Sequence, residues 1–373
     1  MITRLYFWAK DFLSRPSVSP SSRFLSLPLS GPAWVYGRAQ AVRRWGYRGG
    51  IARAHRAGVP VISVGNITAG GTGKTPCVEA VCRVLLADGR RPAVLSRGYG
   101  GSLQEPWGIV SDGRRLMMNA REAGDEPVLL AKRLPSVPVL VGQDRRVTAQ
   151  AAVERCGAQI LVLDDGFQHL RLARDLDIVT VDARDPFGNG HCFPRGLLRE
   201  QPRALGDAGL ILLTQTSRLD GRRIQTVLTA IRRFNRRAPI LNTFHSPVEL
   251  VDLGSGEVWP LARLQGLKVL AFAGIGHPET FFQILDSAGA RVLEAVPFPD
   301  HHTYVPPDLA KLRSWGRLMN VQALITTEKD AVRLEDEPPG DVPVLALRIE
   351  LKIREGEADF LRLIRRAASR GVT

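Results

Sequence analysis

The sequence contains few cysteines and no long apolar run. Its 373 residues include four cysteines, and none of these lies in a C-x-x-C pair or in a Cys/His spacing typical of a zinc site. The sequence therefore predicts reduced thiols in a cytosolic protein rather than a disulfide framework or a zinc centre. No stretch reaches the roughly 18 consecutive apolar residues of a membrane-spanning helix, which argues against an integral membrane protein.

Acidic residues are scarce at the N-terminus. The chain has 51 Lys and Arg against 37 Asp and Glu, a formal net charge of +14, and residues 1–60 hold ten of the basic residues but only one acid, Asp11. This segment also carries tryptophans and tyrosines, and residues 1–12 have an amphipathic helical spacing. We therefore expect residues 1–57 to form a basic, aromatic segment that associates with an anionic membrane surface. A helix packed on its own domain and a single-stranded nucleic-acid site are the open alternatives.

A glycine-rich segment follows the apolar run at 59–64. It reads G-N-I-T-A-G-G-T-G-K-T over residues 65–75 and precedes a helical pattern of apolar residues. A strand, a glycine-rich loop ending in G-K-T and a helix are typical of a phosphate-binding P-loop, whose backbone amides converge on phosphate oxygens. Since the strict motif has glycine where Thr68 stands, a glycine-rich turn with a chance G-K-T is the alternative. The predicted nucleotide-binding residues are Thr68, Ala69, Gly70, Gly71, Thr72, Gly73, Lys74 and Thr75.

Two carboxylates, Asp164 and Asp165, follow the apolar run at 160–163. This is the Walker-B arrangement, in which an aspartate holds the Mg²⁺ shell. Further apolar runs alternate with helical patterns, which predicts an α/β fold: a P-loop NTPase-like parallel sheet with helices on both faces, plus a second, smaller α/β domain. The predicted division is a core domain at 58–240, a hairpin linker at 241–265 and the smaller domain at 266–373.

Seven short motifs lie in order along nearly the whole chain. They are V-G-N-I-T-A-G-G-T-G-K-T-P (64–76), L-S-R-G-Y-G-G (95–101), G-D-E-P (124–127), L-D-D-G-F-Q-H (163–169), F-G-N-G-H-C-F-P-R-G-L-L-R-E (187–200), F-P-D-H-H-x-Y (298–304) and T-T-E-K-D-A-V (326–332). Together they resemble the tetraacyldisaccharide 4′-kinase (lipid A 4′-kinase) family. The P-loop motif of that family also has threonine at the position of Thr68. Residues 193–197 depart from the usual pattern of the family.

The resemblance implies an ATP-dependent kinase of lipid A biosynthesis. Its reaction would transfer the γ-phosphoryl group of ATP to the 4′-hydroxyl of a tetraacyl glucosamine disaccharide 1-phosphate. Because that lipid lies in the inner leaflet, the enzyme would be peripheral on the cytoplasmic face of the bacterial inner membrane. The resemblance further implies ATP and Mg²⁺ as cofactors. We expect no nucleic-acid partner, and no obligate protein partner is evident from the sequence.

The resemblance also implies roles for individual residues. Asp125 would be the general base, Lys74 would hold the phosphates, and His301 from the second domain would orient Asp125 or share its proton. From the residues alone, Asp125 also suits a helix N-cap and His301 a surface loop. Candidates for the metal shell are Thr75, Asp164 and Glu126. The residues predicted to bind the disaccharide, its 1-phosphate or the migrating phosphoryl group, with surface salt bridges as the alternative, are Arg97, Arg145, Gln168 and Glu200.

A different class of P-loop protein is the competing hypothesis. A P-loop NTPase could act as a switch or remodelling factor for a protein or nucleic-acid partner. The sequence lacks the N-K-x-D guanine motif, for which residues 328–330 offer only E-K-D. The basic excess is concentrated in residues 1–60 and forms no distributed stripe, which weighs against a nucleic-acid-binding ATPase.

Overall fold

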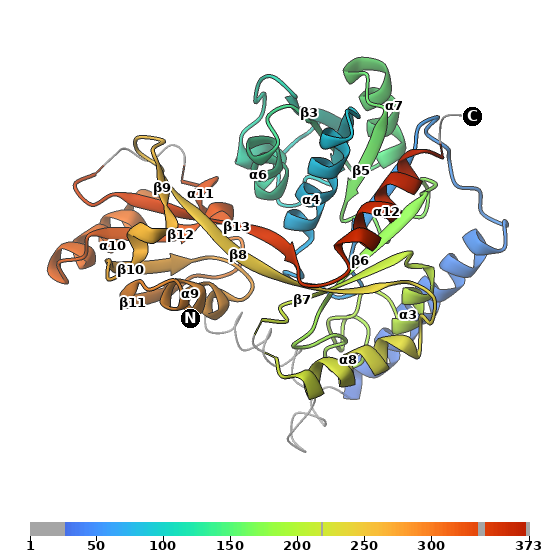
Figure 1. Cartoon of the computed structure of the whole chain (residues 1–373). Helices are drawn as coiled ribbons and strands as arrows, with labels where there is room; N and C mark the ends of the chain where they lie inside the picture. Colours follow the sequence, from blue (N-terminus) through green and yellow to red (C-terminus); the bar gives the residue numbers. More distant parts are fainter. Residues whose placement is uncertain (1–26, 218, 335–339, 371–373) are drawn as a thin grey trace.

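The chain folds into two lobes joined through a continuous sheet (Figure 1). The structure is a computed structural model that describes residues 27–217, 219–334 and 340–370. Within these residues a 13-stranded sheet has the order β11-β10-β12-β13-β8-β7-β6-β1-β5-β2-β4-β3, and β9 pairs with β8 at its side. The amphipathic helix expected over residues 1–12 lies outside the described residues.

Apart from one edge strand, the first lobe is built on short strands that are buried on both faces. Burial on both faces is typical of a parallel sheet covered by helices, and it explains why these runs are continuously apolar. The predicted alternation of strands and helices is confirmed, and an antiparallel edge strand, β3, is added to it. The strands are β1 (Val61–Gly65), β2 (Pro92–Ser96), β3 (Trp107–Asp112), β4 (Pro138–Gly142), β5 (Ile160–Asp164), β6 (Leu176–Asp182) and β7 (Leu210–Thr214). The helices are α3 (Ser30–Arg48), α4 (Lys74–Ala87), α5 (Ala120–Ala123), α6 (Asp125–Arg133), α7 (Arg145–Cys156) and α8 (Gly221–Arg232), with 3₁₀ turns at Leu27–Leu29 and Pro202–Asp207.

The second lobe is a smaller α/β unit with its own core. Its core packs Leu250, Val269 and Ile325 against Phe281 and Leu285. The strands β10, β11 and β12 are parallel, as the predicted strand–helix alternation requires. Its elements are β9 (Val258–Pro260), a 3₁₀ turn at Leu261–Leu264, β10 (Lys268–Ala273), α9 (Pro278–Ser287), β11 (Arg291–Pro297), α10 (Pro306–Leu318), β12 (Ala323–Thr327) and α11 (Glu328–Ala331).

Two long strands, rather than a hairpin linker, connect the lobes. The first residues of β8 (Ile240–Asp252) pair in parallel with β7, and the rest pair antiparallel with β13 (Val344–Ile353). The predicted hairpin exists, since Leu250 pairs with Trp259, but it belongs to the sheet of the second lobe. The linker predicted at 241–265 is therefore corrected: β8 is long enough to be a member of both parts of the sheet.

The last helix returns to the first lobe. In α12 (Glu357–Ala368), the buried Phe360 and Ile364 share one core with residues of α4, and the guanidinium of Arg365 lies 2.9 Å from the carboxylate of Asp88. The domain predicted at 266–373 thus extends too far. Because β13 runs back towards the first lobe (Figure 1), the amphipathic helix that follows it buries its apolar face there.

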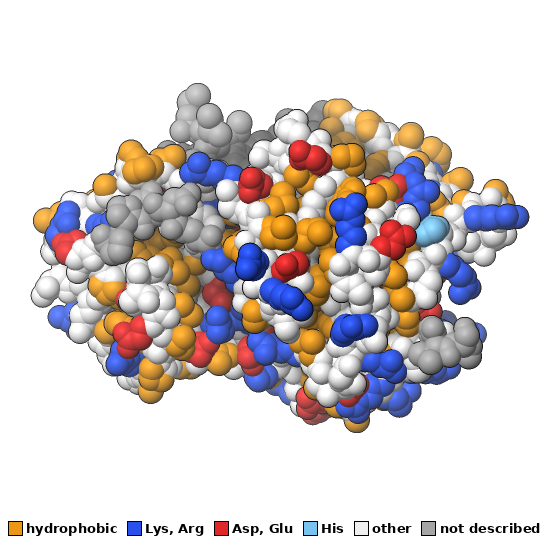
Figure 2. All heavy atoms as spheres, turned by 90° about the horizontal axis from the view of Figure 1, so that it is seen from above, with side chains coloured by type: hydrophobic (Ala, Val, Ile, Leu, Met, Phe, Trp, Pro, Cys, Tyr) orange, Lys and Arg blue, Asp and Glu red, His pale blue; other side chains and the backbone are white. Residues whose placement is uncertain are grey.

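The N-terminal helix α3 buries one face and leaves large apolar side chains on the other. It buries Ala33 and Arg44, whereas Trp34 is 61% exposed and Trp45 is 64% exposed. None of the helices in the described part of the chain is long and apolar enough to cross a bilayer. On the face drawn in Figure 2, Lys and Arg side chains are scattered among hydrophobic and acidic ones.

Candidate active site

The glycine-rich loop joins the end of β1 to the start of α4. Its last glycine, Gly73, has a φ of +81°, and a Cβ there would lie 3.0 Å from the ring of His245, so only glycine fits without strain. Inside the loop, the Asn66 amide donates to the Thr72 hydroxyl at 2.8 Å, and that hydroxyl also lies 2.8 Å from the hydroxyl of Thr180. The side chain of Thr72 therefore holds the loop in shape.

The segment before residue 200 supports the other side of this loop. The backbone amide of Ala69 donates to the carbonyl of Leu197 at 2.7 Å, and the backbone amide of Arg199 donates to the carbonyl of Ile67 at 2.8 Å. Thr68 forms a β-bridge with Leu198. The loop that the sequence marks as a phosphate cradle is thus fixed on both flanks.

Lys74, the first residue of α4, faces the acidic end of β5. Its Nζ lies 3.6 Å from Oδ1 of Asp165, and Arg199 donates to the same carboxylate at 2.7 Å. Burial would raise the pKa of Asp165, but the charges of Lys74 and Arg199 outweigh it and lower that pKa to about 2. The predicted P-loop lysine and Walker-B end therefore meet in one place.

Asp164 lies next to this pair in an acidic environment. Its Oδ2 accepts a hydrogen bond from Ser96 at 3.0 Å, whereas the buried Oδ1 has no partner. Burial, together with the charges of Glu126 and Asp165, raises the pKa of Asp164 to about 7. A buried, unpartnered carboxylate oxygen among other oxygen donors fits a hard cation such as Mg²⁺. Within the described residues no three His, Cys, Asp or Glu side chains gather to hold a metal alone, and Mg²⁺ commonly needs only one or two carboxylates besides phosphates.

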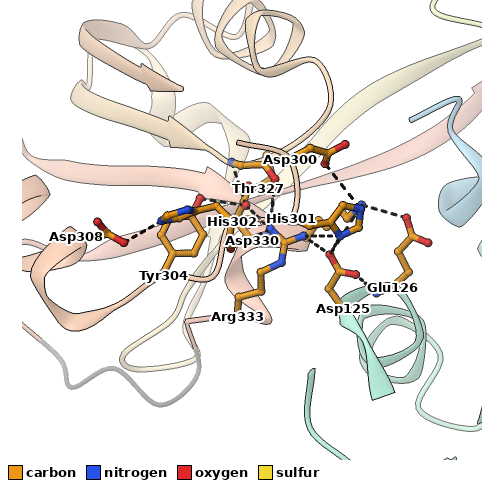
Figure 3. Close-up of polar contacts among 12 residues, drawn as sticks. Asp125, Glu126, Asp300, His301, His302, Tyr304, Asp308, Thr327, Asp330 and Arg333 are labelled. Carbon is orange, nitrogen blue, oxygen red and sulfur yellow. Dashed lines mark hydrogen bonds and ion pairs between the residues drawn. The ribbon is translucent and has the colours of Figure 1, made fainter. Parts of the chain in front are cut away.

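Asp125 and His301 meet across the two lobes (Figure 3). Asp125 opens α6, and its Oδ2 lies 3.1 Å from Nδ1 of His301. The N-cap of α6 is Gly124, while Oδ1 of Asp125 accepts the amide of Glu126 at 3.0 Å. Asp125 is therefore the first residue of the helix and not the N-cap that the capping alternative expected; Oδ1 contacts the next amide and Oδ2 faces the second lobe.

Two cations that the sequence analysis left without a role complete this cluster. Lys329 Nζ lies 3.1 Å from Glu126 Oε1 and 3.8 Å from Asp125 Oδ2, and Arg333 forms an ion pair with Asp125. Burial would raise the pKa of Asp125, but the hydrogen bond from His301 and the charges of Lys329 and Arg333 hold it well below its ordinary value. The available signal for Lys329 was the motif at 326–332, which places it directly after a strand, whereas Arg333 follows that motif and had no signal of its own.

A buried polar cluster fixes the second-lobe side of the site. Asp330 accepts hydrogen bonds from Tyr304 at 3.1 Å and Thr327 at 2.6 Å, and it lies 3.2 Å from Arg333 (Figure 3). His301 adopts a φ of +59°, which is uncommon outside glycine, and its amide donates to the carbonyl of Gly274 at 3.1 Å. The imidazole is therefore held by its backbone as well as by Asp125.

The four predicted substrate-binding residues differ in their surroundings. Arg145 is buried with an unpartnered Nε, and burial lowers its pKa although Asp164 and Asp165 act in the opposite direction. Arg97 is exposed after β2.

The other two predicted substrate-binding residues already have protein partners. Gln168 donates to the carbonyl of Asn66 at 2.8 Å, and buried Glu200 pairs with Arg44 at 2.7 Å. Of the four, Arg145 therefore offers a free donor in the site, and Glu200 holds α3 against the core.

A parallel sheet with a P-loop after β1 and paired carboxylates after β5 defines a P-loop NTPase fold. The chain belongs to the Tetraacyldisaccharide-1-P 4'-kinase family, whose model matches residues 24–368. It is 44% identical over 311 residues to the tetraacyldisaccharide 4'-kinase of Syntrophus aciditrophicus, covering 82% of this chain and 83% of that protein. It is 42% identical over 353 residues to that of Anaeromyxobacter sp. strain Fw109-5, covering 95% of this chain and 94% of that one.

A solved structure shares the fold. It is described as the "apo" form of LpxK from Aquifex aeolicus in complex with ATP, and it superposes with a TM-score of 0.73 at 30% identity over 92% of this chain and 99% of that chain. The predicted fold class, family and kinase activity are confirmed by these comparisons. The hypothesis of a switch or remodelling NTPase is not favoured by them.

Proposed function

We propose that this chain transfers the γ-phosphoryl group of ATP to the 4′-hydroxyl of a tetraacyl glucosamine disaccharide 1-phosphate, in a Mg²⁺-dependent reaction at a membrane surface. The observation that carries the proposal is the meeting of Asp125 and His301 beside the loop that starts α4. Lys74 is close enough to act on the pKa of Glu126, the residue after Asp125, so the phosphate cradle and the interlobe pair share one site.

The nucleotide would bind on the first lobe. The amides of residues 68–75 would surround the β- and γ-phosphates, and Lys74 would turn from Asp165 towards them, because phosphate oxygens compete for the same ammonium. Thr75 and Asp164, with Glu126, would hold Mg²⁺, which neutralises charge on the phosphates when bound. The pKa of Asp164 is about 7, and a cation placed beside its free oxygen would lower this pKa and so favour the ionised carboxylate.

Asp125 would accept the proton of the sugar hydroxyl. Its low pKa keeps the carboxylate ionised, and His301 fixes the direction of Oδ2. The 4′-oxygen then forms a bond to the γ-phosphorus as the bond to the β–γ bridging oxygen breaks, and ADP leaves with that electron pair. Arg145, whose Nε is buried and unpartnered, and the exposed Arg97 would bind the phosphoryl group or the 1-phosphate of the substrate.

The membrane would be contacted through α3. Trp34 and Trp45 are exposed on this helix, and the guanidinium of Arg38 lies 5.2 Å above the Trp34 ring, a combination suited to lipid headgroups. Each basic residue close to an anionic surface contributes about 1 kcal/mol. The protein would therefore be peripheral on the cytoplasmic face of the bacterial inner membrane.

The direct test is transfer from γ-labelled ATP to the disaccharide 1-phosphate in anionic vesicles with Mg²⁺. We expect wild-type protein to label the lipid, a 4′-deoxy acceptor to remain unlabelled, and Lys74→Ala to abolish transfer. Lys352→Ala, which removes an exposed lysine of β13, is the matched control and should retain activity. Label on the 4′-deoxy acceptor, or equal transfer by Lys74→Ala, would refute the proposal.

A further inference from the structure

Arg133, the last residue of α6, is buried and yet uses every donor of its guanidinium. Nε and Nη2 donate to Oε2 of Glu79 at 2.9 and 2.7 Å, and Nη1 donates to both carboxylate oxygens of Glu328 at 3.1 and 2.9 Å. Nη2 also donates to the carbonyl of Ile349 at 2.6 Å. A guanidinium carries five N–H groups in a planar fork, so no other side chain can make this set of contacts.

The three acceptors belong to elements that meet around the site. Glu79 lies in α4, five residues after Lys74, while Glu328 opens α11 directly before Lys329, and Ile349 lies in β13. Arg133 thus connects the helix that follows the phosphate cradle with the helix that supplies Lys329 to Asp125 and Glu126. The carboxylate of Glu328 is fixed from a second direction by Arg348, which donates to it at 3.1 Å.

Helix α6 therefore meets the second lobe at both of its ends. Its first residue, Asp125, contacts His301 and Arg333, and its last residue, Arg133, contacts Glu328. In addition to the strands β8 and β13 that connect the lobes, these two contacts on one helix hold the angle at which the second lobe faces the first.

Stability alone is a weak reason for such a network. Taking charged groups out of water is costly, and buried ion pairs can often be replaced by apolar side chains of similar volume without loss of stability. What apolar contacts do not supply is a fixed direction. Misplacement of a reacting group by about 1 Å can cost about 10²-fold in rate, so direction matters here for turnover.

We infer that Arg133 is a positioning residue for phosphoryl transfer: it sets the orientation of the second lobe so that His301 and Lys329 meet Asp125 and Glu126. This inference rests on the proposed kinase reaction. Arg133 acts through Glu328 and Glu79 and touches neither nucleotide nor acceptor.

The kinetic test compares Arg133→Met with Arg83→Met. Arg83 donates to the other oxygen of Glu79 at 2.9 Å and its side chain is 54% exposed, so it shares one acceptor with Arg133 and is the matched control. We expect Arg133→Met to lower kcat about 10²-fold with ATP affinity retained, and Arg83→Met to resemble wild type. Arg133→Lys should recover only a small part, because an ammonium lacks the planar fork.

A double-mutant cycle separates positioning from mere packing. If Arg133 acts through Glu328, then Glu328→Gln should lower kcat by itself, and adding it to Arg133→Met should cause little further loss. A lowered melting temperature with wild-type kcat in Arg133→Met, or fully additive losses in the cycle, would overturn the inference. Should Arg133→Met fail to fold, wild-type kcat in both Arg133→Lys and Glu328→Gln would overturn it as well.

A distance measurement tests the inference without catalysis. Spin labels at Val147→Cys in α7 and Leu318→Cys in α10, two exposed positions on different lobes, should give one narrow distance in a Cys156→Ser background. We expect Arg133→Met to broaden this distribution and Arg83→Met to leave it unchanged. An unchanged distribution in Arg133→Met would contradict the positioning role, whereas an inactive wild type would instead refute the kinase reaction.

Discussion

Asp164 and Asp125 are buried carboxylates in one site, but their neighbours shift the two pKa values in opposite directions. Asp164, at the end of β5, has Ser96 as its hydrogen-bond donor and Glu126 and Asp165 as acidic neighbours. Asp125 instead receives His301, Lys329 and Arg333 from the second lobe. The same residue type consequently has a raised pKa in the first case and a lowered one in the second.

This difference shows where each carboxylate obtains its counter-charge. The protein itself supplies cations to Asp125, which is ionised whenever the lobes are together. The free oxygen of Asp164 has no hydrogen-bond partner, and the charge of Lys74 lowers the pKa of this carboxyl less than burial and two acidic neighbours raise it, so this oxygen suits a cation that arrives with the nucleotide. The proposed roles, base for Asp125 and metal ligand for Asp164, accord with these different neighbours although both residues are aspartates.

The largest expected effect concerns the aspartate that the second lobe contacts. Asp125→Asn keeps the shape of the side chain but cannot accept a proton, so we expect kcat to fall by about 10²–10⁴-fold while ATP binding is retained. Lipid phosphorylation and nucleotide titration on the same sample measure the two quantities. Asp112→Asn, on the exposed end of β3, serves as the control and should be active. Full turnover by Asp125→Asn would remove it as the base.

The same substitution at Asp164 should act on the metal instead. We expect Asp164→Asn to raise the Mg²⁺ concentration needed for half-maximal activity by about 10–100-fold, with partial recovery at high Mg²⁺. Activity measured against Mg²⁺ concentration checks this. An unchanged Mg²⁺ requirement would place the metal elsewhere.

Neutralising the two carboxylates should change stability in opposite directions. Asp125→Asn leaves the cations of the second lobe without their partner and should lower the free energy of unfolding by about 3 kcal/mol at pH 7. Asp164→Asn relieves a buried, poorly compensated charge and should raise it by about 1–3 kcal/mol in the absence of nucleotide. Denaturant titrations without ATP and Mg²⁺ measure both. Destabilisation by both variants would contradict the proposed difference in environment.

The pH dependence of stability has a predicted sign for each aspartate. The pKa of Asp164 is about 7 when folded against an ordinary value of 3.8, so the folded state binds the extra proton between these values and loses stability as pH rises through them. The pKa of Asp125 is lowered on folding, so its stabilisation is present above the ordinary value and is lost as pH falls below it. Between about pH 4 and pH 7, the melting temperature of the nucleotide-free protein should therefore fall less for Asp164→Asn than for wild type.

The smallest expected effect concerns the hydroxyl that contacts Asp164. Ser96→Ala removes the hydrogen bond to Oδ2 and should cost about 1 kcal/mol of stability, because few atoms are lost and one buried acceptor remains unsatisfied. Ser102→Ala, which removes an exposed hydroxyl contact, should change stability less. Equal melting temperatures for wild type and Ser96→Ala would show that this bond does not stabilise Asp164.

Much of the fold followed from local patterns in the sequence. Strands buried on both faces, such as β2 and β4, are continuous apolar runs, and the glycine-rich loop lies between a strand and a helix as its pattern predicts. The return of α12 to the first lobe could not be predicted in this way. Helical periodicity shows that residues 357–368 have an apolar face, but it does not show which lobe that face contacts.

The site was predictable to a similar extent. Motif positions bring Lys74 to Asp165, the residue after Asp164, because both follow the carboxyl ends of parallel strands of one sheet. The catalytic roles given to Asp125 and His301 stay predictions. Glu200 was expected at the substrate, yet its carboxylate is buried against Arg44, a partner 156 residues away that spacing cannot reveal. The same holds for Arg133 and Glu328, whose contact depends on how the lobes are joined.

The most direct test of phosphoryl transfer at this interlobe site is the position of the new phosphate. Phosphorus NMR of the lipid product from ATP, Mg²⁺ and the disaccharide 1-phosphate should show a second phosphomonoester on the 4′-oxygen with wild-type protein and none with Asp125→Asn. Release of inorganic phosphate without a second phosphomonoester on the lipid, or a phosphate at another sugar position, would contradict it.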